Sequence, residues 1–448
     1  MALFDPEFAP AGLIPSDLFV APHGIPAELC IQCRGAKLLC GKAACPVMMR
    51  AYASMKTTSL IGGGLELEGS SPPSVFVGRT GYPRVAVGPL IPPVTGDTSI
   101  LDTPELWVGR TIPEILEFRS QLVRGMHFVD VHDVEARDKV VERTRELALA
   151  ARPAVVDAAF RKRPTGRVVL DDEVQPFGPS APLAGIEVEN VPLDARLEKK
   201  FYDTDAPARD AVGELFRDGT LVSQLQRAFS VGAFGDKRRR RFVPTRWSIT
   251  AVDSMLGERL MEKTKAAPTV DDFRIFETYD LDTRWVILMM PTAWRYELIE
   301  AWYPSTTWNP FGAEVVVMGD AEFYKGRKAY ASIGGCYYAA RLAVNERLTA
   351  EGRQAGVVIL RETHPGYVMP VGVWNVREHV RRALKEEPRH FDTLEGALAR
   401  VGEVMAIPVA RWIQESQVLT DLKVQRRLDV YALDTRKEAG GKAGLAHR

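Results

Sequence analysis

The feature that most constrains this chain is a group of four cysteines within sixteen residues, at positions Cys30, Cys33, Cys40 and Cys45. Two close pairs joined by a short loop suit a tetrahedral site of four thiolates, because each pair can supply one edge of the tetrahedron. Gly35 and Gly41 follow ligand positions, where a glycine relaxes the tight turn that directs backbone N–H groups towards the sulfurs. The spacing therefore predicts a metal module near the start of the chain.

The residue types favour zinc, one ion per chain, but leave two alternatives open. Four thiolates also suit an iron–sulfur cluster, and Cys45-Pro46 is similar to the Cys-Pro ending of ferredoxin sequences. The second alternative is that no metal binds. Clustered thiols in an intracellular chain more often bind metal than form disulfides.

Charge and hydropathy exclude several classes of protein. The 448 residues include 58 Lys and Arg and 58 Asp and Glu, so no overall field draws the chain to nucleic acid or to an anionic membrane. The first Lys or Arg is Arg34, so we expect no secretory signal, which needs a positively charged start. Apolar runs such as 286–291 are far shorter than the roughly 18 residues of a membrane helix. We expect a cytoplasmic protein without membrane contact.

Hydrophobic periodicity predicts an α+β (mixed α/β) fold, because strands and helices mix without a regular βαβ repeat. Among the clearest elements are helices over 44–56 and 329–347 and a hairpin whose strands, 273–279 and 285–290, flank residues 280–282. The predicted parts are an arm with the four-cysteine zinc module in 1–55, an N-terminal α+β domain in 56–300, a C-terminal α/β domain in 301–418, and a flexible tail in 419–448.

Two local basic patches are candidate contacts for nucleic acid. One lies in the cysteine module, which carries Arg34, Lys37, Lys42 and Arg50. The other is a run of five positive charges followed by an aromatic residue, a combination that can neutralise phosphates and stack on a base. Its members are Lys237, Arg238, Arg239, Arg240, Arg241, Arg246 and Trp247. A solvated surface loop is the alternative interpretation of this run.

The tail contains a peptide with the spacing of a sliding-clamp ligand. Gln425, Leu428 and Tyr431 form the pattern Q-x-x-L-x-x-Y, in which one helical turn places the leucine and the tyrosine on one apolar face. Such peptides usually end in two aromatic residues, whereas here Ala432 follows Tyr431, which weakens the expected affinity. The alternative is an amphipathic helix packed on its own domain.

The C-terminal half contains the residue types of a catalytic pocket within residues 305–367. Carboxylates, a histidine and an arginine stand near predicted strand ends, and the candidate acids and bases are Asp320, Glu322, Glu362 and His364. Arg361 lies beside them in sequence. No spacing among them is a known catalytic signature, and neither a Walker loop nor a dinucleotide-binding glycine pattern occurs. An enzyme acting on nucleic acid or a nucleotide-like substrate is the alternative function.

Several motifs across almost the whole chain resemble the archaeal Nre DNA-repair proteins. Besides the cysteine cluster and the terminal peptide, the resemblance rests on Phe76-Val-Gly-Arg79, Gly81-Tyr-Pro83, Val87-Gly-Pro89, Phe242-Val-Pro-Thr-Arg-Trp247 continuing to Asp253, and Trp308-Asn-Pro-Phe-Gly312.

The resemblance implies a DNA-repair protein recruited to DNA by a sliding clamp of the PCNA type. One subgroup of the family, the NreA-like proteins, has an amino-terminal zinc finger of four cysteines. The resemblance to this subgroup implies that Cys30, Cys33, Cys40 and Cys45 are zinc ligands. Tethering to a clamp raises the local concentration at DNA, so weak intrinsic affinity suffices, which agrees with a zero net charge. A third hypothesis is a zinc-stabilised scaffold whose tail binds another partner.

Overall fold

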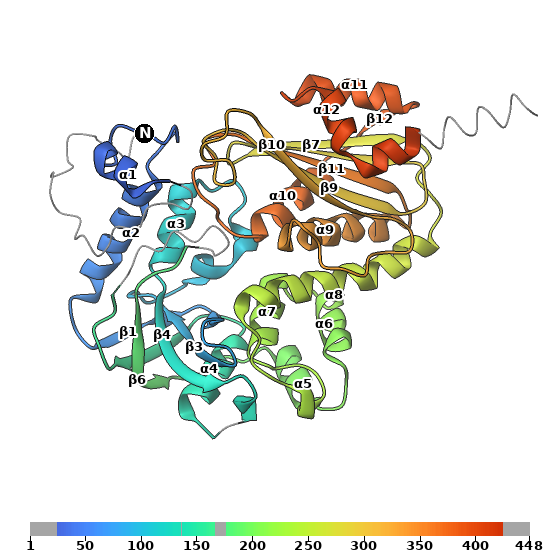
Figure 1. The fold of residues 1–448 in the computed structure, drawn as a ribbon. Coiled ribbons are helices and arrows are strands. Elements are labelled where there is room, and N and C mark those ends of the chain that lie inside the picture. Colours follow the sequence, from blue (N-terminus) through green and yellow to red (C-terminus); the bar gives the residue numbers. More distant parts are fainter. Residues whose placement is uncertain (1–24, 136, 166–175, 424–448) are drawn as a thin grey trace, which may run out of the picture. The chain divides into compact units, whose positions relative to one another are not determined.

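The computed structural model describes residues 25–135, 137–165 and 176–423, which form two compact units of helices and sheets (Figure 1). The first unit comprises the chain up to Leu256 together with the segments Pro304–Ala313 and Pro365–Asn375. The second comprises Gly257–Tyr303, Glu314–His364 and the chain from Val376 onwards. Each unit contains a six-stranded mixed sheet, which confirms the predicted α+β class.

The sheet of the first unit has the strand order β1-β5-β6-β4-β3-β2. Its strands pair antiparallel except for β4 and β6, which are parallel. The strands are β1 (Glu66–Ser71), β2 (Val75–Val77), β3 (Arg84–Ile91), β4 (Val123–Asp130), β5 (Ala154–Phe160) and β6 (Ser180–Val188). The accompanying helices are α1 (Ala27–Cys33), α2 (Pro46–Ile61), α3 (Ile112–Ser120), α4 (Lys139–Ala148), α5 (Ala195–Tyr202), α6 (Ala208–Arg217) and α7 (Val222–Ser230). Helix α8 (Thr245–Ala266) begins in this unit and ends in the second.

Helix starts in the first unit follow local sequence signals. Pro46 is the first residue of α2. An N–H group at this position would have no acceptor within the helix, so proline, which lacks the N–H, loses no hydrogen bond there. Helix α3 begins with a capping box, in which Thr111 and Glu114 satisfy each other's free N–H groups. The Asp138 and Asp194 side chains accept from the N–H groups of the second and third residues of α4 and α5.

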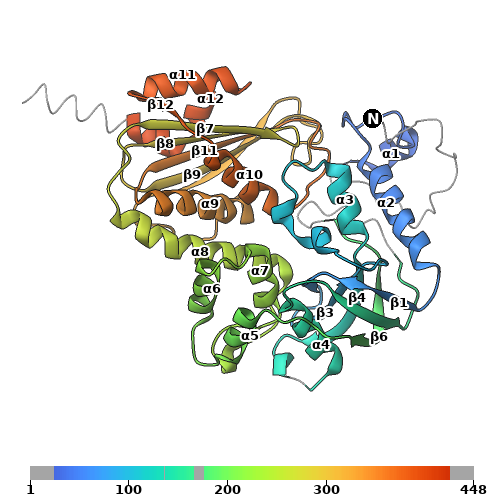
Figure 2. The ribbon, with the colours of Figure 1, turned by 180° about the vertical axis from the view of Figure 1, so that it is seen from behind.

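The sheet of the second unit has the order β10-β9-β11-β8-β7-β12, with β9 and β11 parallel and the other pairs antiparallel. The strands are β7 (Phe273–Asp280), β8 (Thr283–Met290), β9 (Arg295–Trp302), β10 (Val316–Glu322), β11 (Gly356–Thr363) and β12 (Arg389–Phe391). Helices α9 (Gly335–Glu351) and α10 (Trp374–Lys385) cover one face, and α11 (Leu394–Val404) and α12 (Val409–Glu415) cover the other, as both ribbon views show (Figures 1 and 2).

The predicted hairpin across residues 280–282 is confirmed as β7 and β8. Asp280 pairs with Thr283, and the two residues between them, Leu281 and Asp282, have positive φ values of 48° and 51°. Two consecutive left-handed residues match the right-handed twist of the flanking strands, which is why this turn closes a tight hairpin.

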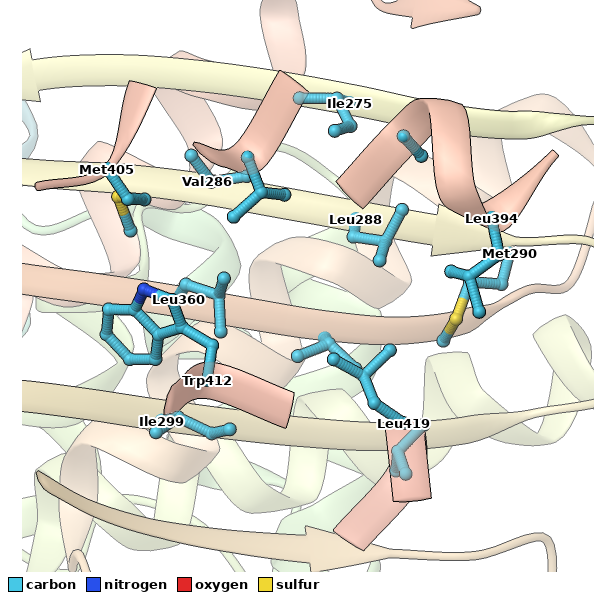
Figure 3. Packing of buried hydrophobic residues seen from close by; sticks show 14 of the residues in the cluster. Ile275, Val286, Leu288, Met290, Ile299, Leu360, Leu394, Met405, Trp412 and Leu419 are labelled. Atoms are coloured by element: carbon cyan, nitrogen blue, oxygen red, sulfur yellow. The ribbon is translucent and has the colours of Figure 1, made fainter. Parts of the chain in front are cut away.

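One apolar core of the second unit lies between the sheet and helices α11 and α12. Alternate residues of the central strands, Leu288, Ile299 and Leu360 among them, point to this side, and Trp412 of α12 and Leu419 pack within the same cluster (Figure 3). Each fully buried side chain of this size contributes roughly 1.5–3 kcal/mol. Within the described residues, no helix combines the length and the apolar character needed to cross a membrane.

The units divide the chain differently from the boundary expected near residue 300. Residues Gly257–Tyr303 belong to the second unit, because β9 is hydrogen-bonded to β10 and β11. The sequence did not predict strand β9, because Glu297 and Glu300 occupy buried positions in it and interrupt its apolar pattern.

Candidate functional sites

The cysteine module is a series of tight turns between two helices. Cys30 and Cys33 lie on α1, and Cys45 directly precedes α2. Arg34 ends α1 in the left-handed conformation. The predicted tight turns at the glycines are present, because Gly35 and Gly41 have φ values of 74° and 72°, a conformation that residues with a side chain rarely adopt.

The four thiols lie close enough to influence one another's ionisation. Burial, and then the neighbouring thiols of Cys45, Cys40 and Cys33, raise the pKa of Cys30 to about 11. Burial also acts to raise the pKa of Cys33, but hydrogen bonds from backbone N–H groups, those of Leu39 and Gly35 among them, lower it overall. N–H groups directed at a sulfur stabilise its thiolate, which is the form that binds metal.

The donor set fits a thiolate-binding metal, although the arrangement is not that of a formed site. All five cysteines are free thiols. Within residues 25–135, 137–165 and 176–423, no three Cys, His, Asp or Glu side chains are grouped as metal ligands. Burial, and then repulsion from the neighbouring thiolates, raises the pKa of Cys30, so a dication between the sulfurs would favour the deprotonated state.

The loop between the cysteine pairs packs on a segment that is remote in sequence. The Lys42 ammonium is 4 % exposed and donates to the backbone oxygen of Ser305 at 3.2 Å. A Cβ on Gly41 would lie 2.3 Å from the Ser305 hydroxyl, so the close approach requires glycine. Lys42 and Arg50 are both buried, which removes two of the four charges expected in this basic patch. Arg34 and Lys37 remain exposed.

The basic run at 237–241 divides into exposed and buried members. Lys237, Arg238, Arg239 and Arg241 are exposed. Arg240 points inward, where its guanidinium donates to the backbone oxygens of Gly235 at 2.9 Å, Phe201 at 2.7 Å and Asp203 at 2.8 Å. Burial lowers the pKa of Arg240. Arg240 is therefore a structural residue that joins two loops. Of the other four, Lys237 lies 3.9 Å from the Glu135 carboxylate, and all four are exposed to solvent.

Three segments singled out in the sequence converge beside this run. The N–H of Val131 donates to Pro83 at 3.0 Å, and the N–H of Phe242 donates to Val131 at 2.8 Å. The N–H of Val77 donates to the Thr245 hydroxyl at 2.8 Å. Motifs separated by more than 160 residues thereby share one surface of the first unit.

An exposed aromatic pair stands on this surface. The rings of Tyr82 and Trp247 lie 5.4 Å apart, and the side chains are 45 % and 47 % exposed. Arg79, Arg84 and Arg246 come from the same segments, and Asp130 pairs with Arg84 across the strands. We call these aromatic and basic side chains, with Lys237, Arg238, Arg239 and Arg241, the Trp247 patch. Tyr82 was not among the predicted site residues, although its motif was noted.

The four catalytic candidates of the C-terminal half do not meet in one pocket. Val317 and Ala321 of β10 and Leu360 of β11 pack towards α11 and α12. Side chains alternate between the two faces of a sheet, so residues next to these three point to the opposite face, and residues two positions away point to the same face. Asp320 and Glu322 therefore point to the α9 face, whereas Glu362 points to the α11 face.

Glu362 is fully occupied by structural hydrogen bonds. Its carboxylate accepts from the Tyr303 hydroxyl at 2.9 Å and from the backbone N–H groups of Ala406 and Ile407 at 3.0 and 3.1 Å. Burial, together with the bond to Glu362, raises the pKa of Tyr303 to about 12. His364 stacks on Tyr303 with 4.3 Å between ring centres, and its Nε2 is 3.9 Å from the Glu362 carboxylate.

Asp320 and Glu322 are likewise bonded within the second unit. Glu322 accepts from the Trp294 indole at 3.1 Å and from Arg341 at 2.8 Å. Asp320 accepts from the Arg327 guanidinium at 2.8 Å and from the Ser332 N–H at 2.6 Å. Asp320 therefore anchors the loop that connects β10 to α9.

That loop carries features that the sequence analysis missed. We call residues 323–334 the β10–α9 loop; its exposed aromatic and basic side chains are Phe323, Tyr324, Lys325, Lys328 and Tyr330. The signal was present in the interleaved aromatic and basic letters between a strand and a Gly-Gly helix start. It was overlooked because the neighbouring carboxylates suggested a catalytic pocket. Gln425, Leu428 and Tyr431 lie outside the described residues.

Comparison with known proteins identifies the family. The chain matches the family described as "Archaeal Nre, N-terminal" over residues 39–309 and "Archaeal Nre, C-terminal" over residues 322–431. It is 42 % identical over 393 residues to the DNA repair protein NreB of Archaeoglobus fulgidus, covering 87 % of this chain and 96 % of that protein. The chain therefore belongs to the archaeal Nre family.

Two proteins named NreA are also similar. The DNA repair protein NreA of Archaeoglobus fulgidus is 36 % identical over 370 residues, which cover 82 % of this chain and 92 % of that protein. NreA of Haloferax volcanii is 34 % identical over 370 residues, with 80 % and 88 % covered. The matches include NreB and NreA proteins alike, so they define the family rather than a subgroup. No solved structure matches the chain.

The anchoring role of Asp320 leads to a prediction for Asp320→Asn. Burial opposes ionisation, yet the bonds from Arg327 and Ser332 hold the pKa of Asp320 below its ordinary value of 3.8. A lowered folded-state pKa adds stability that is present above the ordinary pKa and lost as the pH falls. We expect the substitution to lower the free energy of unfolding by about 1–2 kcal/mol at pH 7. Denaturant unfolding from pH 7 to 3 should show this difference shrinking at the acid end.

The control is Asp271→Asn, which removes a carboxylate that is 77 % exposed and pairs with Arg353 at 3.3 Å. An exposed pair of this kind contributes about 0–1 kcal/mol. Equal losses in both variants would contradict a special role for Asp320.

Proposed function

We propose that this chain is a DNA-repair protein that contacts DNA directly through the Trp247 patch. Its relatives bear the name DNA repair protein. With no net charge, the chain has no global attraction to a polyanion, so any contact must be made by a local cluster. The two other parts of the proposal are a zinc ion in the cysteine module and recruitment by a sliding clamp.

The observation that carries the DNA contact is the convergence of three distant segments on one exposed aromatic pair. Exposed aromatic rings offer a face on which nucleic-acid bases can stack. Lys237, Arg238, Arg239 and Arg241 supply positive charge next to the segment that bears Trp247. Charge and stacking together constitute a binding surface for a nucleic acid.

The first test combines Arg238→Gln and Arg239→Gln in one variant and Trp247→Ala in another. Each lost phosphate contact should reduce the slope of log affinity against log salt by about 0.9. Loss of the indole should weaken binding by roughly 1–3 kcal/mol with little change in that slope. Fluorescence anisotropy of labelled DNA over a series of salt concentrations measures both quantities.

Matched controls separate this patch from general surface effects. Lys385→Gln removes an exposed charge of the second unit, and Tyr202→Ala removes a ring that is 70 % exposed. Both should leave DNA binding within about twofold of the wild type. If the patch variants bind DNA as the wild type does, the proposed contact is wrong.

We further propose that the cysteine module binds one zinc ion. Its support is the paired spacing, the left-handed turns after Cys33 and Cys40, and the backbone N–H groups directed at the Cys33 sulfur. A bound zinc would join α1 to the start of α2 through thiolates and would supply folding free energy. In this proposal, zinc has a structural role.

The test for zinc is metal analysis of the purified chain and of Cys33→Ser. We expect one zinc per chain, less than about a tenth of that content in the variant, and a lower melting temperature, because the metal stabilises the folded module. Cys336→Ser, which removes the thiol outside the module, should keep the zinc. Iron with an absorbance band near ~400 nm would instead establish the iron–sulfur alternative.

We also propose that the terminal peptide binds a sliding clamp of the PCNA type. Gln425, Leu428 and Tyr431 have the required spacing, and the position after Tyr431 holds alanine. Affinity should therefore be modest, since one apolar anchor is missing.

A titration of the full chain against purified clamp tests this part. The double variant Leu428→Ala, Tyr431→Ala should weaken binding at least about tenfold, because both side chains on the apolar face are lost. Arg427→Ala lies in the same peptide outside the pattern and should bind as the wild type does. Unchanged affinity of the double variant would exclude this peptide as the clamp ligand.

A further inference from the structure

We propose that the β10–α9 loop binds an unpaired strand of nucleic acid by stacking its bases on Phe323, Tyr324 and Tyr330. The inference rests on the proposed function in that it takes DNA as the partner, but it concerns a different surface, in the second unit. It names the form of DNA that this surface recognises: bases that are not held in a duplex.

The loop exposes an unusual concentration of aromatic surface. Phe323, Tyr324 and Tyr330 are 40 %, 51 % and 64 % exposed and lie within eight residues of one another. The N–H of Gly326 donates to the Phe323 oxygen at 2.7 Å, so the chain turns sharply between the first two rings and the third. Each ring offers a π-face to a base, and such stacking accepts any base type.

The positive charge of the loop is complementary to the negative charge of a phosphate backbone. Lys325 and Lys328 are exposed, and Arg327 is neutralised by Asp320 at 2.8 Å. After Glu322, the next acidic residue in the chain is Glu346, so the loop itself contributes no negative charge. Lys265 adds a further ammonium group, 5.3 Å from the centre of the Tyr324 ring. This combination of cations and rings favours nucleic acid over a protein partner.

The loop is held in place by hydrogen bonds within it and to the ends of β10 and α9. Asp320 accepts from Arg327 and from the Ser332 N–H, and Arg327 also donates to the Ala329 oxygen at 2.7 Å. Tyr330 packs on the buried Tyr338 ring at 5.4 Å, and the Tyr338 hydroxyl accepts from the Ala331 N–H at 3.0 Å. A preorganised loop loses less conformational entropy on binding, so a small contact can be specific.

Stacking selects unpaired bases because the faces of bases in a duplex are already covered by their neighbours. A duplex can offer the loop only its phosphates, which would engage Lys325 and Lys328 but not the rings. The rings should therefore matter for single strands, whereas the lysines should matter for both forms.

The test compares a labelled single strand of about 20 nucleotides with the duplex of the same sequence, using the full chain and fluorescence anisotropy. The variant Tyr324→Ala, Tyr330→Ala should lose at least about tenfold in affinity for the single strand and less than about twofold for the duplex. Tyr324→Phe, Tyr330→Phe keeps the rings and should bind as the wild type does, which excludes a folding defect. Tyr279→Ala, an exposed ring beside acidic residues of the same unit, is the control.

The outcomes separate this inference from the proposed function. Equal losses for both forms of DNA would overturn stacking as the contact. If the Trp247 patch variants lose DNA binding while the alanine variant of the loop keeps it, this inference alone is overturned. A wild-type chain that binds neither form would overturn both. The alanine variant of the loop could bind the single strand with unchanged affinity, while cells that carry it no longer survive DNA damage. That result would overturn the inference in favour of a protein partner.

Discussion

A carboxylate can be kept inside a protein only if other hydrogen bonds replace those it had with water, and both units depend on this requirement. In the second unit, Glu297 and Glu362 accept from backbone N–H groups on either side of α12 and so hold the C-terminal helices on the sheet. Glu300 pairs with Arg361 at 2.7 Å. In the first unit, Asp102 joins Arg119 and Arg227. Of these carboxylates, only Glu362 was interpreted as catalytic, and its hydrogen bonds give it a structural role instead.

The two regions that define the family are not two folding units. The N-terminal region ends at residue 309 and the C-terminal region begins at 322, yet β9 from the first pairs in parallel with β11 from the second. A parallel pair needs a long connection, and here the connection includes β10 and α9. Neither region can complete the second sheet alone.

Particular residues show how far the sequence could be interpreted. The hairpin turn was predictable because the apolar runs on both sides of residues 280–282 are separated by a short polar segment. The turns at Gly35 and Gly41 were predictable from the metal-module spacing. In contrast, Arg240 and Lys42 are buried among carbonyl groups, although each looks like a neighbouring exposed cation in the sequence. The acceptors that bury them come from remote segments, which no local pattern reveals.

The sequence by itself determined the α+β class, the hairpin of β7 and β8, the paired cysteines and the family, because these depend on local periodicity and on residue spacing. Tertiary structure alone decided which charges reach the surface and which residues share a site. It directed Asp320 and Glu362 to opposite faces of one sheet, and it brought Tyr82 to Trp247 from 165 positions away. The physical reason is that strand alternation is local, whereas pairing register and packing are set by contacts between distant segments.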